Sequence, residues 1–298
     1  MNRVAIAPPA SSWVAIFLML ASGALVAATS LLAKVLGLPG ETALGLNPLQ
    51  VSAGRFFFAL CALLLFVLLR PSARPDFSGA RWRWHILRSV CGWLGITCMF
   101  AAVARMPLAE ATAISFLNPL VAMLLAVAML GEHLNAKKIT AAGLAVCGAL
   151  LILKPGLQAF QPAGVLALGA ALFIGFEVIF VKRLSDSEPA LRVLLINNSI
   201  GAAISVAVAA FVWAWPTGFQ WQMLVALGVV MVAAQSLFIQ SMKRGEASFV
   251  IPALYSVLVF ASFYDFLLYG AVPSRSAVAG ALLIVSGAMV LAVRRRKR

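Results

Sequence analysis

The strongest constraint in this sequence is a series of apolar runs, each about 20 residues long, that follow one another along the chain. A helix of that length crosses the hydrocarbon core of a bilayer, which is about 30 Å thick. The polar segments between the runs are too short for a soluble domain. The pattern predicts an all-α polytopic membrane protein with ten transmembrane helices, at residues 13–36, 48–69, 84–104, 109–130, 137–154, 163–182, 191–213, 221–242, 248–268 and 275–293.

The composition excludes a soluble globular protein. Hydrophobic residues make up 63% of the chain and charged residues 11%, whereas soluble domains carry about 25% charged residues. The net charge of +14 would suggest nucleic acid binding in a soluble protein. Here the basic residues lie between the apolar runs, which is the pattern that orients membrane proteins. We therefore expect a lipid bilayer, and not nucleic acid, as the partner.

The basic residues also predict the orientation of the chain. If the N-terminus is cytoplasmic, the opposite segments hold only Arg105, Lys154 and Arg275. Cytoplasmic loops are enriched in lysine and arginine, so we expect both termini in the cytoplasm. The cytoplasmic segments then carry Arg3, Arg70, Arg74, Arg81, Arg83, Lys137, Lys138, Lys182, Arg183, Arg192, Lys243, Arg244, Arg294, Arg295, Arg296, Lys297 and Arg298.

Short matches between the two halves of the chain indicate an internal repeat. Residues 109–112 (AEAT) follow the third run and residues 245–248 (GEAS) follow the eighth. Further along, Cys147-Gly148 matches Ser286-Gly287. The matches predict two five-helix units, at residues 1–158 and 159–298. Because five is odd, the second unit enters the membrane inverted, an architecture of secondary transporters with a site near the bilayer midplane.

Several motifs resemble those of the drug/metabolite transporter superfamily, in its EamA-type branch. They are Ser22-Gly23 through Ala33-Lys34, Pro48 followed by Arg55-Phe56, Leu108-Ala109-Glu110-Ala111, and Gly131-Glu132. The second half departs from this pattern, because Ala271 stands where Glu132 has its counterpart.

The resemblance implies a multi-pass protein of the bacterial inner membrane, with a cavity between helices one, three, four, six, eight and nine. It also implies the export of small molecules. The family's aromatic amino acid exporters are the members that the chain resembles most. We therefore expect export of amino acids, aromatic and other, with cationic drugs or other small metabolites as the alternative.

Charged residues inside apolar runs are costly and are usually kept for a function. Glu177 can bind a substrate amine or a coupling proton, or it can pair with Lys182 or Arg183. Lys34 and Arg55 can receive a substrate carboxylate, but the resemblance favours a gating or structural role. Asp265 can be a site acid or an interfacial group bonded to a tyrosine, and we favour the second. His85 and Arg88 are interpreted as part of an interfacial stripe.

Five uncharged residues complete the predicted substrate site together with Glu177. They lie near the middle of their runs, where they can also serve helix packing. Pro119 adds a further expectation, because it frees a backbone carbonyl that must find a partner or face a cavity. The uncharged candidates are Trp93, Met99, Asn118, Gln235 and Tyr255.

Other function classes lack their motifs. The sequence has no G-x-x-x-x-G-K-[ST] motif for ATP, no H-E-x-x-H motif and no aspartate-rich run. The four cysteines lie in apolar runs without a CxxC pair, and the two histidines are far apart. We expect no enzyme activity, no metal and no cofactor. A channel would require rings of charge that this chain lacks. The prediction is a secondary transporter that works by alternating access, with a monomer as the expected state.

Overall fold

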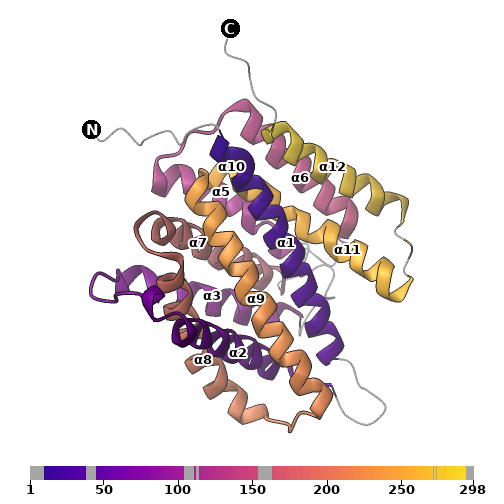
Figure 1. The fold of residues 1–298 in the computed structure, drawn as a ribbon. Helices are drawn as coiled ribbons and strands as arrows, with labels where there is room; N and C mark the ends of the chain where they lie inside the picture. Colours follow the sequence, from indigo (N-terminus) through magenta and orange to yellow (C-terminus); the bar gives the residue numbers. More distant parts are fainter. Residues whose placement is uncertain are drawn as a thin grey trace.

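The computed structural model describes residues 10–37, 45–103, 111, 114–153, 163–270, 272 and 274–292, and its regular structure is entirely helical over these residues (Figure 1). The α-helices are α1 (Ala10–Gly37), α2 (Pro48–Leu69), α3 (Trp82–Val103), α5 (Asn118–Leu130), α6 (Ala136–Leu153), α7 (Ala163–Ser187), α8 (Ala190–Ala209), α9 (Gly218–Arg244), α10 (Ala247–Val250), α11 (Ser256–Tyr269) and α12 (Arg275–Ala292). Short 3-10 helices are η1 (Pro71–Ala73), η3 (Ala210–Val212) and η4 (Ile251–Tyr255).

The expected all-helical membrane fold is confirmed. Among the described residues, seven helices are long and apolar enough to cross a bilayer, and α5 and residues 275–290 of α12 are shorter apolar helices. Large apolar side chains are widely exposed on these helices, as lipid-facing positions require. The ten-helix count, the inverted repeat and the cytoplasmic termini remain predictions.

Two of the predicted spans are broken near a proline. The fourth is interrupted by a turn at 116–117, directly before Asn118 and Pro119. Because Pro119 has no N–H, the Ser115 carbonyl four residues earlier loses its helical donor. The Asn118 side chain replaces it, donating to Ser115 O at 2.8 Å. The Ser115 carbonyl that Pro119 frees therefore has the Asn118 side chain as its partner.

The ninth span is broken in a similar way, into α10, η4 and α11. Pro252 lies in η4, whose tighter winding interrupts the α-helical pattern. Tyr255, at the end of η4, is 2% exposed and donates its hydroxyl to Phe116 O at 2.8 Å. This bond joins the two breaks, one from each half of the sequence.

The helices form two bundles, each of which takes helices from both halves of the chain. The first bundle consists of α3, α5 and α7, and the second of α1, α9 and α11, with α7 in contact with α9 between them. The pairs α2 with α8 and α6 with α12 pack beside these bundles (Figure 1). The space between the two bundles is where the cavities described below are found.

The α6–α12 pair crosses very closely. A Cβ atom added to Gly148 would lie 2.5 Å from the carbonyl oxygen of Gly280, and one added to Gly287 would lie 2.8 Å from that of Ala141. Small residues let membrane helices approach to backbone contact, which is a main source of their packing energy. These glycines therefore fix the crossing point of the two helices.

Candidate functional site

A cavity of about 380 Å³ lies between the two bundles, and we call it the main cavity because of this position. Its walls come from α1, α2, α3, α7, α8 and α9. Eight of the nineteen lining residues are polar or charged, and the others are apolar or glycine, so the cavity is more polar than most small-molecule pockets. The lining comprises Val26, Leu49, Ser52, Arg55, Phe56, Ser89, Gly92, Trp93, Ile96, Thr97, Ile174, Glu177, Asn197, Gly201, Ile204, Ser205, Val208, Met231 and Gln235.

A second cavity of about 340 Å³ continues the first toward one end of the protein. The two share four lining residues, Ser52, Arg55, Ile96 and Ile174. The second cavity also contacts Gly37 at the end of α1 and Pro48 at the start of α2. The combined cavity therefore runs from the middle of the protein to the end where α1 stops and α2 begins.

Three charged residues meet at the inner part of this cavity. Arg88 is 2% exposed and lies behind the wall, with its Nε 3.8 Å from Glu177 Oε1. The Glu177 carboxylate lies 3.0 to 3.2 Å from where a Cβ of Gly92 would be, so this glycine makes room for it. Arg55 lines both cavities, and its guanidinium carbon lies 4.4 Å above the Phe56 ring.

At the opposite end of the protein, polar contacts link the two bundles, and we call their charged residues the clamp (Glu132, Lys138, Lys182 and Glu246). Glu132 follows α5 and accepts hydrogen bonds from the backbone N–H groups of Ala247 and Ser248, at 2.7 and 2.8 Å. A carboxylate at a helix N-terminus is stabilised by these free N–H groups and by the helix dipole. Lys138 bonds Glu246, and it donates to Ser248 Oγ at 2.7 Å.

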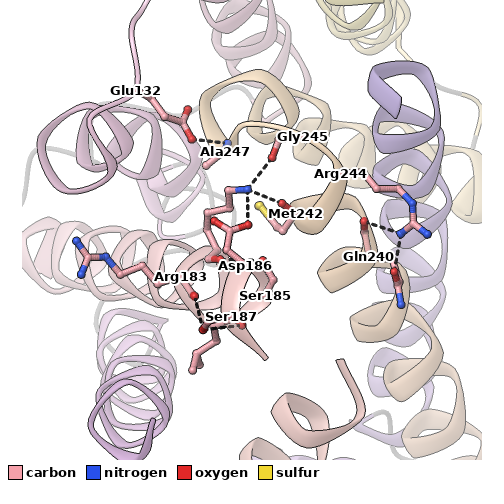
Figure 2. Close-up of polar contacts among 12 residues, drawn as sticks. Glu132, Arg183, Ser185, Asp186, Ser187, Gln240, Met242, Arg244, Gly245 and Ala247 are labelled. Carbon is pink, nitrogen blue, oxygen red and sulfur yellow. Dashed lines mark hydrogen bonds and ion pairs between the residues drawn. The ribbon is translucent and has the colours of Figure 1, made fainter. Parts of the chain in front are cut away.

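Lys182 forms the second half of the clamp. Its ammonium on α7 donates to Met242 O at 2.7 Å and Gly245 O at 2.9 Å, at the C-terminal end of α9. It also pairs with Asp186 Oδ1 at 2.8 Å. Figure 2 shows Asp186, Met242 and Gly245 gathered at this point, and Glu132 directed at Ala247. The clamp therefore ties the first bundle to the second at this end.

The comparison with protein families identifies the architecture. The model of the EamA-like transporter family matches residues 13–154 and again residues 161–293.

The chain belongs to the EamA-like transporter family.

Relatives of this EamA-like transporter carry different small molecules, according to their names. The S-adenosylmethionine uptake transporter of Rickettsia bellii is 26% identical over 85% of this chain and 86% of the relative. The pseudopaline exporter CntI of Pseudomonas aeruginosa PAO1 is 25% identical over 79% and 84%. The riboflavin transporter of Vibrio cholerae is 26% identical over 81% of each chain.

A solved crystal structure shares the fold of this EamA-like transporter. It aligns with a TM-score of 0.75 and 22% sequence identity, over 94% of this chain and 96% of the other. The family and its apolar helices establish a multi-pass transporter of the bacterial inner membrane and agree with the expected absence of enzyme activity. The comparisons support small-metabolite transport and do not single out the aromatic amino acid exporters that the motifs suggested.

The structure brings together some of the predicted site residues of the transporter. Trp93, Glu177 and Gln235 line the main cavity, and Met99 lines the second. Arg55, expected to be a gating or structural charge, lines both. Their roles in binding remain predictions.

Other predicted residues lie elsewhere. Asn118 and Tyr255 bond backbone carbonyls at the breaks and are absent from the described cavity lining. Lys34 is exposed near the end of α1. Asp265 lies on α11, but its side chain is outside the part of the chain that the structure describes.

Three expectations about buried charges differ from the structure. Glu177 faces Arg88, and not Lys182 or Arg183, because five or six positions along a helix do not bring side chains to one face. His85 and Arg88 are buried and do not form an interfacial stripe. His85 Nε2 lies 3.0 Å from Glu188 Oε2, which links α3 to the α7–α8 turn.

Some cavity residues were missed from the sequence. Asn197, Gly201 and Ser205 line the main cavity from α8, although the seventh span was not expected to contribute. Their spacing of four residues places three small or polar side chains on one helix face, a signal that could have found them. The described residues of α5 and of α10 to α11 do not line the cavities, in contrast to the arrangement implied by the family resemblance.

Replacing Tyr255 by phenylalanine should lower stability by about 1 kcal/mol, because the Phe116 carbonyl loses its donor. The melting temperature in detergent measures this, and Tyr264→Phe is the matched control because its hydroxyl makes a longer bond, 3.3 Å to Ala24 O. Weaker substrate binding with an unchanged melting temperature would instead support a role for Tyr255 in the substrate site.

Proposed function

We propose that this protein is a secondary transporter that exports amino-acid-like metabolites across the inner membrane by alternating access. The observation that carries the proposal is that two adjoining cavities extend between the bundles to one end of the protein, while the clamp links the bundles at the other end. A cavity that is reached from one side and sealed on the other is what an alternating-access cycle requires in each of its two end states.

The packing supports two inverted halves at residues 1–158 and 159–298. In the predicted repeat, α1 corresponds to α7 and α3 corresponds to α9. The α1–α9 contact therefore has the α3–α7 contact as its counterpart, and both are present. The matched landmarks Gly148 and Gly287 imply that Ala141 corresponds to Gly280. The contact of Gly148 with Gly280 then has the contact of Gly287 with Ala141 as its counterpart, and both are present. The double match of the family model supports the same division.

The cavity opens toward the end that the positive-inside pattern assigns to the outside. The clamp lies at the end assigned to the cytoplasm, where Lys138 and Lys182 join the basic cytoplasmic set. The described conformation would then be outward-facing. The breaks at Pro119 and Pro252 are positions where the bundles can bend during the change to the inward-facing state.

The lining suits an amino-acid-like substrate with an apolar body and a carboxylate, with or without an ammonium group. Trp93 and Phe56 offer aromatic surface, Arg55 can receive a carboxylate, and Glu177 can receive an ammonium. The alternative, a cationic drug, would use Glu177 as its only partner and would compete with Arg88 for it. The relatives include both an uptake transporter and an exporter by name, so they do not decide the direction of transport. The proposed export follows the family resemblance of the sequence motifs.

Counterflow in proteoliposomes tests the proposal. We expect purified protein, in vesicles loaded with an unlabelled amino acid, to accumulate the same radiolabelled amino acid transiently and to saturate. A panel of amino acids and of ethidium-like cations should show flux for the amino acids. Counterflow of the cations alone would support the alternative, and single-channel currents in a planar bilayer would refute the transporter assignment.

A further inference from the structure

Among the residues that the structure describes, those at the cavity carry more positive than negative charge. Of the charged residues that the structure describes, only Arg55 and Glu177 line the two cavities, and Arg88 stands directly behind Glu177. Two guanidinium groups therefore share one carboxylate. If Glu177 is ionised, Arg88 neutralises it and Arg55 remains; if Glu177 is protonated, both guanidiniums remain.

The guanidinium groups also have free hydrogen-bonding capacity. The buried Nε of Arg55, and the buried Nε and Nη1 of Arg88, have no hydrogen-bond partner among the described residues. Arg88 meets Glu177 only at 3.8 Å, longer than a hydrogen bond. Stacking on Phe56 occupies one face of the Arg55 guanidinium, which leaves the N–H groups at its edge available to an acceptor.

An unpaired charge at membrane depth is expensive, and a ligand that brings the missing negative charge removes this cost. A carboxylate fits the planar fork of a guanidinium with two parallel hydrogen bonds. A zwitterion would leave the surplus charge uncompensated, and a cation would increase it.

We propose that Arg55 binds an anionic group of the substrate, and that the substrate carries a net charge of −1 with its carboxylate on Arg55. This inference rests on the proposed transport function and narrows the substrate class within it, to metabolites such as acidic or N-acylated amino acids. The side chain of Trp93 and the apolar wall would hold the remainder of the molecule.

Two matched series of ligands test the charge preference without assuming one substrate. In the first, N-acetyl-L-phenylalanine, L-phenylalanine and L-phenylalaninamide carry charges of −1, 0 and about +1 on one skeleton at pH 6, below the α-amino pKa. In the second, L-glutamate, L-glutamine and L-lysine carry charges of −1, 0 and +1 without an aromatic ring. We expect the anion of at least one series to raise the melting temperature of the purified protein most, and to inhibit counterflow most.

The variants Arg55→Gln and Arg55→Lys separate recognition from structure. Removing one partner of a buried charge pair costs at least about 2 kcal/mol, or about 30-fold in affinity, so Arg55→Gln should lose the anion preference. Arg55→Lys keeps the charge and should retain the preference with weaker binding. Glu177→Gln makes the cavity more positive and should still prefer the anion. Arg244→Gln, at an exposed arginine on the clamp side of α9, is the control.

Each outcome decides the inference. If neither anion is the best ligand of its series, or if Arg55→Gln prefers anions as strongly as the wild type, the inference fails. If Arg55→Gln does not fold, the preference of the wild type and of Arg55→Lys decides. Counterflow of zwitterions or cations without counterflow of anions would support the proposed transport and refute anion binding at Arg55. Stabilisation by anions without any counterflow would support anion binding at Arg55 and refute the proposed transport.

Discussion

Replacing Gly148 by leucine should destabilise the protein by about 3 kcal/mol, the upper part of the range for overpacking. An added Cβ would lie 2.5 Å from the Gly280 carbonyl oxygen and 2.8 Å from a carbon of Ile284. The nearest atom belongs to the backbone of α12, so a side-chain rotation cannot relieve the contact. The helices α6 and α12 would have to move apart, losing the close packing that holds membrane helices together.

The melting temperature in detergent, with the yield of monodisperse protein, measures this effect. Gly143→Leu is a matched control on the same helix, because nothing lies within 4 Å of an added Cβ there. We expect Gly143→Leu to behave as the wild type. Equal stability of the two leucine variants would contradict the observed crossing of α6 and α12.

Replacing Lys182 by methionine should open the closed end of the transporter. The variant removes the two hydrogen bonds to the carbonyls at the end of α9 and the ion pair with Asp186. Lys182 is only 9% exposed, so water can replace these bonds only in part. Hydrogen bonds to a charged group contribute about 2 kcal/mol each. The loss of one such bond shifts the ratio of the two end states about 30-fold, and the loss of both shifts it further, toward the state that opens at the clamp.

Cysteine labelling measures the shift. Thr97, on the wall of the main cavity, is replaced by cysteine after Cys61, Cys91, Cys98 and Cys147 are removed. A membrane-impermeant maleimide applied from outside should label this position in the parent protein and label it much more slowly in Lys182→Met.

The control for this experiment is Lys243→Met, which removes an exposed lysine close to the clamp. Labelling from outside should stay at the parent rate in this variant. Unchanged outside labelling in Lys182→Met would show that the clamp does not hold the closed end. Faster labelling from outside would show that the assigned orientation is reversed.

The sequence predicted local features well because their causes are local. The apolar runs predicted helices, since a lipid-embedded backbone must satisfy its hydrogen bonds within each helix. Pro119 predicted a freed carbonyl, because the loss of its N–H affects the residue four positions earlier. Gly131 and Gly270, which end α5 and α11, both adopt left-handed conformations with φ of 69° and 62°, as helix-terminating glycines commonly do.

The candidate site was predicted only in part, because it depends on which helices become neighbours. Asn118 and Tyr255 are polar and mid-span in the sequence, like true lining residues, yet each bonds a backbone carbonyl at the α5 break. Arg88 was assigned to the interface, although it faces Glu177, 89 positions away in the chain. Polarity at membrane depth indicates that a residue needs a partner, and the partner can be a substrate, a backbone group or another helix.

By itself, then, the sequence determined that the chain is a helical membrane protein of the transporter kind, because hydrophobic length and motif spacing are properties of single segments. The tertiary structure alone decided that Arg55 and Glu177 share a cavity and that Lys182 links α7 to the end of α9. These arrangements follow from the packing of the α3–α5–α7 bundle against the α1–α9–α11 bundle. Contacts between segments so far apart are fixed by backbone approach at small residues and by buried charge pairing, which no single segment reveals.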